Sequence, residues 1–360
     1  MRPRYLLPVG VATAAARSLP WPGTDDSSTS PRVLPDTVPE PNISKSVYHI
    51  ITESERGRRF TDLLEGHHEL QKRLADDEQN VTVFVPVDDA FRRLNGLRRS
   101  DEEISIREVL EYHVLRGRYS LDDLAGARTL STMLEERDMD RRKQRVHVGG
   151  GMSGVEINFY SRVIGSESIA GANGVVHFLD DVLIPPPRHD RLIAASPRRC
   201  LGTFSEALRI SGASEEVRGH LRGVTVFAPT DEAWEALGPE VNAFLFSEEG
   251  RGYLNALARY HILIGEAVYT DNMEDVKEEG LFPTMLVGAN VSVEMGPVKR
   301  LWRGEGVEGV RDVPARDGVV HVVDEVLFPP GGDDAGVPGG VEGVRRRLGH
   351  FIGGFESNEL

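Results

Sequence analysis

The chain has 360 residues, of which 57 are acidic and 42 basic, so its formal net charge at pH 7 is −15. This length allows two domains of ordinary size, each able to bury a core of its own. The acidic balance argues against nucleic acid or an anionic membrane as a partner, because both need a basic protein face. The single cysteine, Cys200, excludes an intramolecular disulfide and a multi-cysteine zinc site.

The first 43 residues have the composition of a leader. Residues 1–16 combine Arg2 and Arg4 with an uncharged run that ends in three alanines, which is typical of a secretory signal peptide. A disordered tail is the alternative, because Pro8 and Gly10 interrupt the apolar run. Residues 17–43 hold six prolines among serine, threonine and aspartate, and we expect a disordered Pro/Ser-rich leader there.

Two further patterns bear on the compartment. The motif Asn-x-Ser/Thr makes Asn42, Asn80 and Asn290 candidate N-glycosylation sites. No other stretch approaches the roughly 18 apolar residues of a membrane span, so we expect no transmembrane span in the mature chain. A secreted, a cell-surface and a vacuolar destination all stay open, as does cleavage of the signal peptide.

Two sequence blocks occur twice, in the same order. The first is VTVFVPVDDAF at residues 81–91 and VTVFAPTDEAW at residues 224–234; the second is NGVVHFLDDVLIPP at residues 173–186 and DGVVHVVDEVLFPP at residues 317–330. The copies lie 143 or 144 positions apart, too far for a solenoid repeat of about 20 to 50 residues. We therefore expect tandem domains over 44–187 and 198–330, a linker over 188–197 and a Gly-rich flexible tail over 331–360.

Within each expected domain the elements follow one order. A helical pattern is followed by a predicted strand. This strand ends at Pro86 or Pro229, because proline has no N–H to donate to a β-ladder. Asp88 or Thr230 then caps a new helix, and a later amphipathic helix ends in a Tyr-His pair. Valine-rich extended segments follow, and the second block opens with Asn-Gly or Asp-Gly, which favours a tight hairpin turn. Helices gathered apart from the strands predict an α+β fold with an antiparallel sheet.

Each copy carries two histidines at matching places. The pairs Tyr112-His113 and Tyr260-His261 lie on the apolar stripe of their helix, where a core histidine with satisfied hydrogen bonds is the ordinary finding. His177 and His321 alternate in register with valines that we expect to face inward, so the same interpretation applies to them.

Sequence motifs of enzymes are not found in the chain. It has no nucleophile elbow, no HExxH zinc motif and no Gly-Lys phosphate loop, so we expect no catalytic, cofactor-binding or metal-binding residues. The basic run Arg141–Arg145 is interpreted as a solvated loop that nearby acidic residues balance. A site for a polyanion and a site for a dibasic protease are the alternatives for this run.

The repeated blocks resemble the two signature boxes of the fasciclin-like (FAS1) domain family, with TVFVP or TVFAP in the first box and GVVH in the second. This resemblance implies two tandem β-wedge domains, each an antiparallel sheet beside a cluster of helices. It also implies a non-enzymatic adhesion or interaction module without cofactor, extracellular or at the cell surface, which binds protein or glycan partners. In animal members the Tyr-His region is linked to integrin binding, so the resemblance nominates Tyr112, His113, Tyr260 and His261 as candidate partner-binding residues.

Similar two-domain proteins of fungi are associated with the vacuole and with the fusion of autophagosomes to it. A luminal vacuolar protein that acts in membrane traffic is therefore the alternative function. A hydrolase is a second alternative. The identity of the partner and the oligomeric state stay open.

Overall fold

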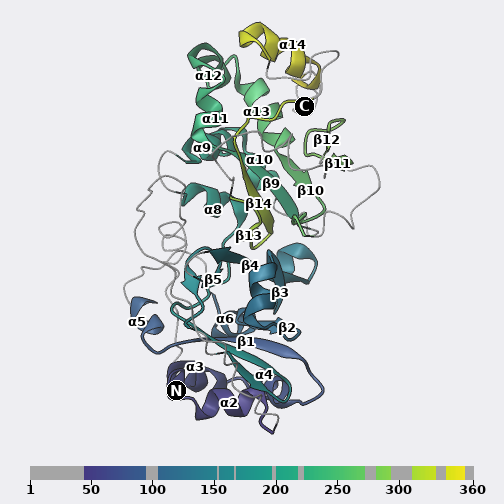
Figure 1. The fold of residues 1–360 in the computed structure, drawn as a ribbon. Helices are drawn as coiled ribbons and strands as arrows, with labels where there is room; N and C mark the ends of the chain where they lie inside the picture. The colour runs from purple at the N-terminus through teal and green to yellow at the C-terminus, as the bar shows by residue number, and fades with distance from the viewer. Residues whose placement is uncertain are drawn as a thin grey trace, which may run out of the picture. The chain divides into compact units, whose positions relative to one another are not determined.

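The structure is a computed structural model that describes residues 44–94, 104–151, 154–165, 168–196, 200–217, 223–271, 281–292, 310–329 and 338–352. The chain divides into two compact units (Figure 1), Met1–Glu135 with Lys143–Pro185 and Glu136–Arg142 with Pro186–Leu360. Residues 136–142 thus belong to the second unit, although the sequence places them within the first repeat. The expected signal peptide and leader, residues 1–43, lie outside the described residues.

An eight-stranded sheet forms the centre of the first unit, in the order β6-β5-β4-β3-β2-β1-β8-β7. Its strands are β1 (Val81–Pro86), β2 (Val114–Arg116), β3 (Thr129–Glu136), β4 (Arg142–Gly151), β5 (Gly154–Ile157), β6 (Ser161–Arg162), β7 (Ile169–Gly171) and β8 (Gly174–Leu179). The two signature blocks form β1 and β8, which pair in parallel, with Val83 opposite Val176. β1 also pairs with β2, and β8 with β7, in antiparallel fashion.

The sheet is therefore mixed, which corrects the expectation of an antiparallel sheet. The long connection between the two blocks brings the chain back to the end of β1 at which it started, so β8 enters in the same direction. The α+β class itself is confirmed, because most neighbouring strands of the sheet pair in antiparallel fashion and helices pack against it.

Side chains of β1 alternate between two core clusters of the first unit. Val81, Val83 and Val85 pack with helices α2 (Val47–Glu53), α3 (Arg58–Glu65), α4 (His68–Ala75) and α6 (Ile106–Tyr112). Phe84 points to the other face and packs with apolar side chains of β3, β4 and α7 (Leu121–Gly126). A short helix α5 (Ala90–Leu94) follows β1 directly.

The second unit repeats this arrangement around a four-stranded sheet in the order β10-β9-β14-β13. Its elements are α8 (His189–Ala194), α9 (Gly202–Ser211), α10 (Ala213–Val217), β9 (Val224–Pro229), α11 (Asp231–Glu235), α12 (Pro239–Leu245), α13 (Arg251–Tyr260), β10 (Ile262–Ile264), β11 (Leu281–Pro283), β12 (Asn290–Ser292), β13 (Val313–Ala315), β14 (Gly318–Val323) and α14 (Gly340–Ile352). The two blocks again form parallel neighbours, β9 and β14, with Val226 opposite Val320.

The second residue of the second block, which is the first residue of β8 or β14, is a glycine in each repeat. The neighbouring strand comes too close there for a side chain. A Cβ at Gly174 would lie 2.0 Å from the Val81 carbonyl oxygen, and one at Gly318 would lie 1.8 Å from that of Val224. A hairpin is present in each repeat, but its turn lies one residue earlier than the predicted Asn-Gly or Asp-Gly dipeptide. The two turn residues directly precede these glycines, since Gly171 pairs with Gly174 and Ala315 with Gly318.

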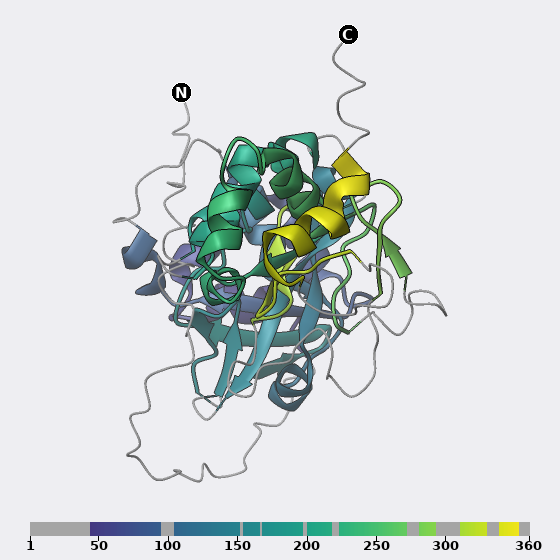
Figure 2. The same cartoon turned by 90° about the horizontal axis from the view of Figure 1, so that it is seen from above.

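Two segments that we expected to be irregular contain helices of the second unit. The expected linker over 188–197 includes α8, whose residues His189 and Ile193 are buried. The expected tail over 331–360 includes α14, which packs beside α12 and α13 (Figure 2) and buries Val344 and Leu348. The glycines of this segment obscured an apolar spacing that one face of a helix satisfies.

Candidate functional site

The histidines of the Tyr-His pairs are buried hydrogen-bonding elements. The Nδ1 atom of His113 lies 2.7 Å from the carbonyl oxygen of Val109, one helical turn earlier, so Nδ1 carries the hydrogen. Its Nε2 then accepts the backbone N–H of Leu183 at 3.0 Å. His261 makes the matching two bonds in the second unit, at 2.8 and 2.9 Å. Each ring joins the end of its helix to the part of the second block that follows its strand, β8 or β14.

The histidines of the second block use the opposite tautomer. His177 donates from Nε2 to the carbonyl oxygen of Tyr119 at 2.8 Å, and its Nδ1 accepts the hydroxyl of Ser168 at 2.9 Å. His321 donates from Nε2 to the carbonyl oxygen of Val268 at 2.9 Å. Because carbonyl oxygens only accept, the contacts fix which nitrogen of each ring is protonated.

Burial keeps these four rings neutral. It lowers the pKa of His113 and of His261 from 6.5 to about 4, since a charged imidazolium would lose its hydration. Burial also lowers the pKa of His177 and of His321. The rings therefore act as fixed neutral connectors of backbone groups at pH 7.

The two tyrosines of the pairs are also in the core. Tyr112 is fully buried, and its hydroxyl donates to the Arg145 carbonyl oxygen at 3.1 Å and accepts from Asn158 at 2.8 Å. Tyr260 is 5% exposed and donates to the Asn290 carbonyl oxygen at 3.2 Å. Thus the four nominated partner-binding residues occupy the core, in agreement with the packing interpretation, and a partner could reach them only by displacing that core.

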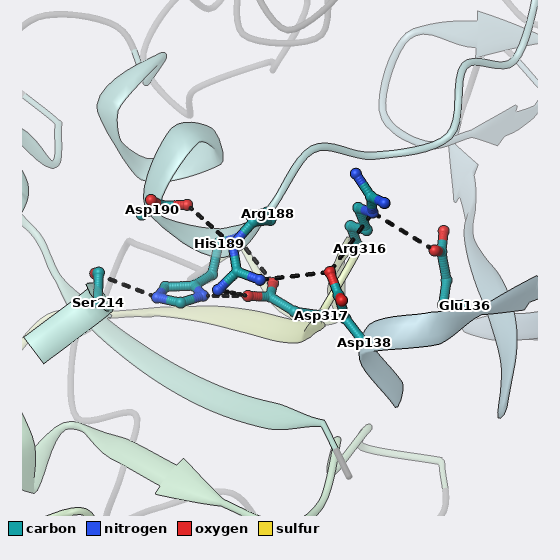
Figure 3. Close-up of polar contacts among 8 residues, drawn as sticks. All are labelled: Glu136, Asp138, Arg188, His189, Asp190, Ser214, Arg316 and Asp317. Carbon is teal, nitrogen blue, oxygen red and sulfur yellow. Dashed lines mark hydrogen bonds and ion pairs between the residues drawn. The ribbon is translucent and has the colours of Figure 1, made fainter. Parts of the chain in front are cut away.

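A buried charged cluster lies in the second unit, centred on Asp317 (Figure 3). Asp317 is 3% exposed and stands in the turn between β13 and β14. Its carboxylate accepts the backbone N–H of His189 at 2.9 Å and the Nδ1–H of the same residue at 2.7 Å. Nη2 of Arg188 lies 3.0 Å from Oδ2. Burial raises the pKa of Asp317, but the His189 bonds and the Arg188 charge together hold it below its ordinary value.

Asn173 takes the place of Asp317 in the first unit. Its Oδ1 accepts the backbone N–H of Val47, the first residue of α2, at 2.8 Å. Its Nδ2 donates to the carbonyl oxygens of Leu74 and Asp76, both at 2.9 Å. A neutral amide therefore joins α2 to the end of α4, whereas in the second unit a carboxylate and the His189 ring join α8 to α10.

The cluster continues to residues 136–142. Nη1 of Arg188 lies 3.4 Å from Oδ2 of Asp138. Nε of Arg316 lies 3.6 Å from the same oxygen and 3.8 Å from Oε2 of Glu136. Oδ1 of Asp190 lies 3.9 Å from Nε of Arg188. With Asp190 and Asp317 added, two guanidinium groups thus face four carboxylates, and all six side chains are at least half buried.

Ser214, His189 and Asp317 are joined by side-chain contacts in the order found in a Ser-His-Asp triad. The Ser214 hydroxyl lies 3.2 Å from Nε2 of His189, whose Nδ1 bonds Asp317. A hydrolase needs a nucleophile that the substrate can reach. Ser214 is 7% exposed and His189 is fully buried, so the contacts join α8, α10 and the β13–β14 turn without access for a substrate.

The remaining candidates lie at the surface or outside the described residues. Asn80 and Asn290 are exposed, and Asn42 lies outside the described residues. Arg141 and Arg142 of the basic run are exposed. Within the described ranges, no group of three or more His, Cys, Asp or Glu side chains could hold a metal ion. No helix in these ranges is long and apolar enough to cross a membrane.

Our sequence reasoning missed the cluster because Arg188 and His189 fell in the expected linker and Asp317 in a turn. The repeat offset could have revealed the helix that begins at His189. Residue 189 lies 142 positions after Val47, the first residue of a helix, so a helix was to be expected there as well.

The comparisons with known proteins agree with the repeated fold. The family model of the fasciclin domain matches twice, at residues 56–185 and 200–329. Aurofusarin biosynthesis cluster protein S of Gibberella zeae is 26% identical over an alignment of 365 positions, which covers 92% of this chain and 88% of that protein. Among solved structures, a domain pair of the insect cell adhesion molecule fasciclin I covers 75% of the chain at 18% identity, with a TM-score of 0.37.

Larger animal proteins match over part of their length. Human stabilin-1 is 28% identical over an alignment of 271 positions, which covers 69% of this chain and 10% of stabilin-1. Fasciclin-1 of Schistocerca americana is 23% identical over an alignment of 287 positions, which covers 76% of this chain and 42% of that protein. The chain thus spans less than half of each of these relatives. Because the family model covers most of the chain in two copies, the chain belongs to the fasciclin domain family.

Proposed function

We propose that this protein is a non-enzymatic interaction module of the extracellular space or the cell surface, which binds protein or glycan partners. One observation carries the proposal: the chain consists mainly of two fasciclin domains, and resemblance to this family implies an adhesion or interaction module. The histidines and tyrosines that the two copies share serve the core. Recognition then falls to exposed surfaces, on which the copies differ in sequence.

The exposed sequons fit a route through the secretory pathway. Asn80 is exposed just before β1. The hydroxyl of Thr82 in the same sequon is buried, donates to the Gly117 carbonyl oxygen at 2.8 Å and accepts the Tyr119 N–H at 2.9 Å. A glycosyltransferase that reads this hydroxyl must therefore act before the first unit folds.

The test is binding of the purified full chain to intact cells and to cell-wall material. We expect saturable binding that protease or glycosidase treatment of the surface reduces, depending on whether the partner is a protein or a glycan. An unrelated soluble protein of similar size and net charge is the control. Binding no greater than that of the control would overturn the proposal.

A second candidate is an accessory role in a biosynthetic gene cluster. The Gibberella zeae relative matches along nearly the whole chain, and its name assigns it to the aurofusarin cluster. We expect disruption of the gene to change the secondary metabolites of the organism that encodes it, measured by mass spectrometry of extracts. An unchanged profile, with the neighbouring genes expressed, would contradict this role.

A luminal vacuolar protein that acts in membrane traffic stays the alternative function. A full chain with a C-terminal fluorescent tag, observed under nutrient starvation, distinguishes this function from adhesion. Fluorescence that collects in the vacuole would favour membrane traffic, whereas fluorescence at the cell surface and in the medium would favour adhesion.

A further inference from the structure

Residues 136–142, here named the tip segment, form a tight turn between β3 and β4. The 3-10 turn η1 (Arg137–Met139) is followed by Asp140 and Arg141, whose φ values of 53° and 59° lie in the left-handed region. The Arg141 N–H closes the turn on the Glu136 carbonyl oxygen at 2.9 Å. This backbone holds two acidic side chains, Glu136 and Asp138, next to Met139.

Met139 is the apolar anchor of the tip segment. It is 2% exposed and forms a small cluster with Ala267, Tyr269 and Val319 of the second unit. A Cβ added at Gly223 would lie 3.7 Å from the Met139 Cγ, so the thioether side chain packs closely over this glycine. Val319 of β14 is fully buried in this cluster.

Two arginines flank the anchor and attract the acidic side chains. Arg188 and Arg316 both lie within 4 Å of Asp138, and Arg316 also faces Glu136. Arg188 is held in place by Asp317, 3.0 Å from its Nη2. The second unit therefore presents an apolar patch to Met139 and two guanidinium groups to the acidic side chains of the tip segment.

The first unit has an arginine at the position that Ala267 occupies in the second unit. Arg118 precedes the carbonyl group that accepts from His177, and Ala267 precedes the one that accepts from His321, so the two positions correspond. The Arg118 guanidinium donates hydrogen bonds to the carbonyl oxygens of Ala172 and Gly171 at the β7–β8 turn, at 2.8 and 2.9 Å. Alanine cannot do this, which leaves Val319 to be covered by Met139.

We propose that the tip segment is a built-in ligand of the second fasciclin domain. The surface that it covers, here named the tip site, consists of Arg188, Ala267, Tyr269, Arg316 and Val319. It recognises a short turn in which a methionine is accompanied by carboxylates one and three positions before it. This inference holds whether or not the protein acts in adhesion, because it concerns how the chain recognises its own segment.

The first experiment measures binding in trans to a full chain in which residues 136–142 are replaced by glycine and serine. A fluorescent synthetic peptide of residues 134–144 is the probe. We expect it to bind, and we expect Met139→Ser in the peptide to weaken binding about tenfold or more, since a buried methionine side chain is lost. Asp138→Asn in the peptide should also weaken binding. Binding of this variant peptide should depend less on salt concentration than binding of the parent peptide. No binding, or equal binding of the parent and Met139→Ser peptides, would overturn the proposal.

A second measurement keeps the proposal testable if the replaced chain fails to fold. Hydrogen exchange is compared in the full chain with Met139→Ala and with the exposed control Arg137→Ala. We expect Met139→Ala alone to speed exchange in β14 and leave β1 unchanged, because Val319 loses its cover. Faster exchange confined to β3 and β4 would show that the tip segment serves its own hairpin, and the proposal would be wrong.

Discussion

His189 presents both its backbone N–H and its ring Nδ1–H to the carboxylate of Asp317, at 2.9 and 2.7 Å. In the first repeat the amide of Asn173 accepts the backbone N–H of Val47 at the same place. The two copies therefore anchor the start of a helix to the second signature block in two ways, one neutral and one charged. The charged version needs all of its partners, since a buried charge without a counterpart is costly.

We expect Asp317→Asn to destabilise the second unit by about 3–5 kcal/mol, because it removes the carboxylate that faces His189 and Arg188. Adding His189→Val recreates the pair found in the first repeat and should recover part of the loss. Urea unfolding measures both effects, and Asp62→Asn on the exposed face of α3 is the control. A loss no larger than that of the control would contradict a structural role for the pair.

Stability should fall on mild acidification because of the buried histidines. The pKa of His113 and of His261 is about 4 in the folded protein and near 6.5 when unfolded, so the unfolded chain binds more protons in between. The contribution of the two neutral rings to the free energy of unfolding is fully present above pH 6.5. It is lost as the pH falls towards 4, by up to roughly 3 kcal/mol per ring. The urea midpoint measured from pH 7 to 4.5 tests this.

A matched pair of variants identifies the source of that pH dependence. His113→Asn should weaken the pH dependence of the first unit, which keeps the buried His177, although it lowers stability at pH 7. The control His68→Asn, at an exposed position, should leave the profile of the parent chain unchanged. The pKa of Asp317 is already below its ordinary value, so its protonation acts only at lower pH. A profile that stays flat between pH 7 and 4.5 in the parent chain would show that the rings are not the titrating groups.

The repeated fold could be predicted from the sequence because the patterns that indicate it are local. A strand that ends at Pro86 or Pro229 and a glycine forced by a neighbouring carbonyl are visible in a single copy. The parallel pairing of the blocks was not visible, since it depends on where a long connection returns. The cluster around Asp317 was also hidden, because its members are separated by up to 181 positions and meet only in the folded chain.

Helix α14 should be a necessary part of the second unit. Leu348 is fully buried against α12 and α13, and we expect Leu348→Ala to cost about 2–5 kcal/mol through lost burial and a residual cavity. Arg346→Ala on the exposed side of the same helix should change stability by no more than about 0.5 kcal/mol. Thermal unfolding compares the two variants. If they behave alike, the packing of α14 does not support the unit.

Ser214 should contribute to stability and not to catalysis. Its contact with His189 resembles one contact of a Ser-His-Asp triad. A reagent or substrate cannot reach this hydroxyl, because Ser214 is 7% exposed and its partner His189 is fully buried. We expect Ser214→Ala to cost about 1 kcal/mol, the usual worth of one hydrogen bond. We also expect no labelling of the folded parent chain by a fluorophosphonate. Labelling that Ser214→Ala abolishes would show that the site opens, and would revive the hydrolase alternative.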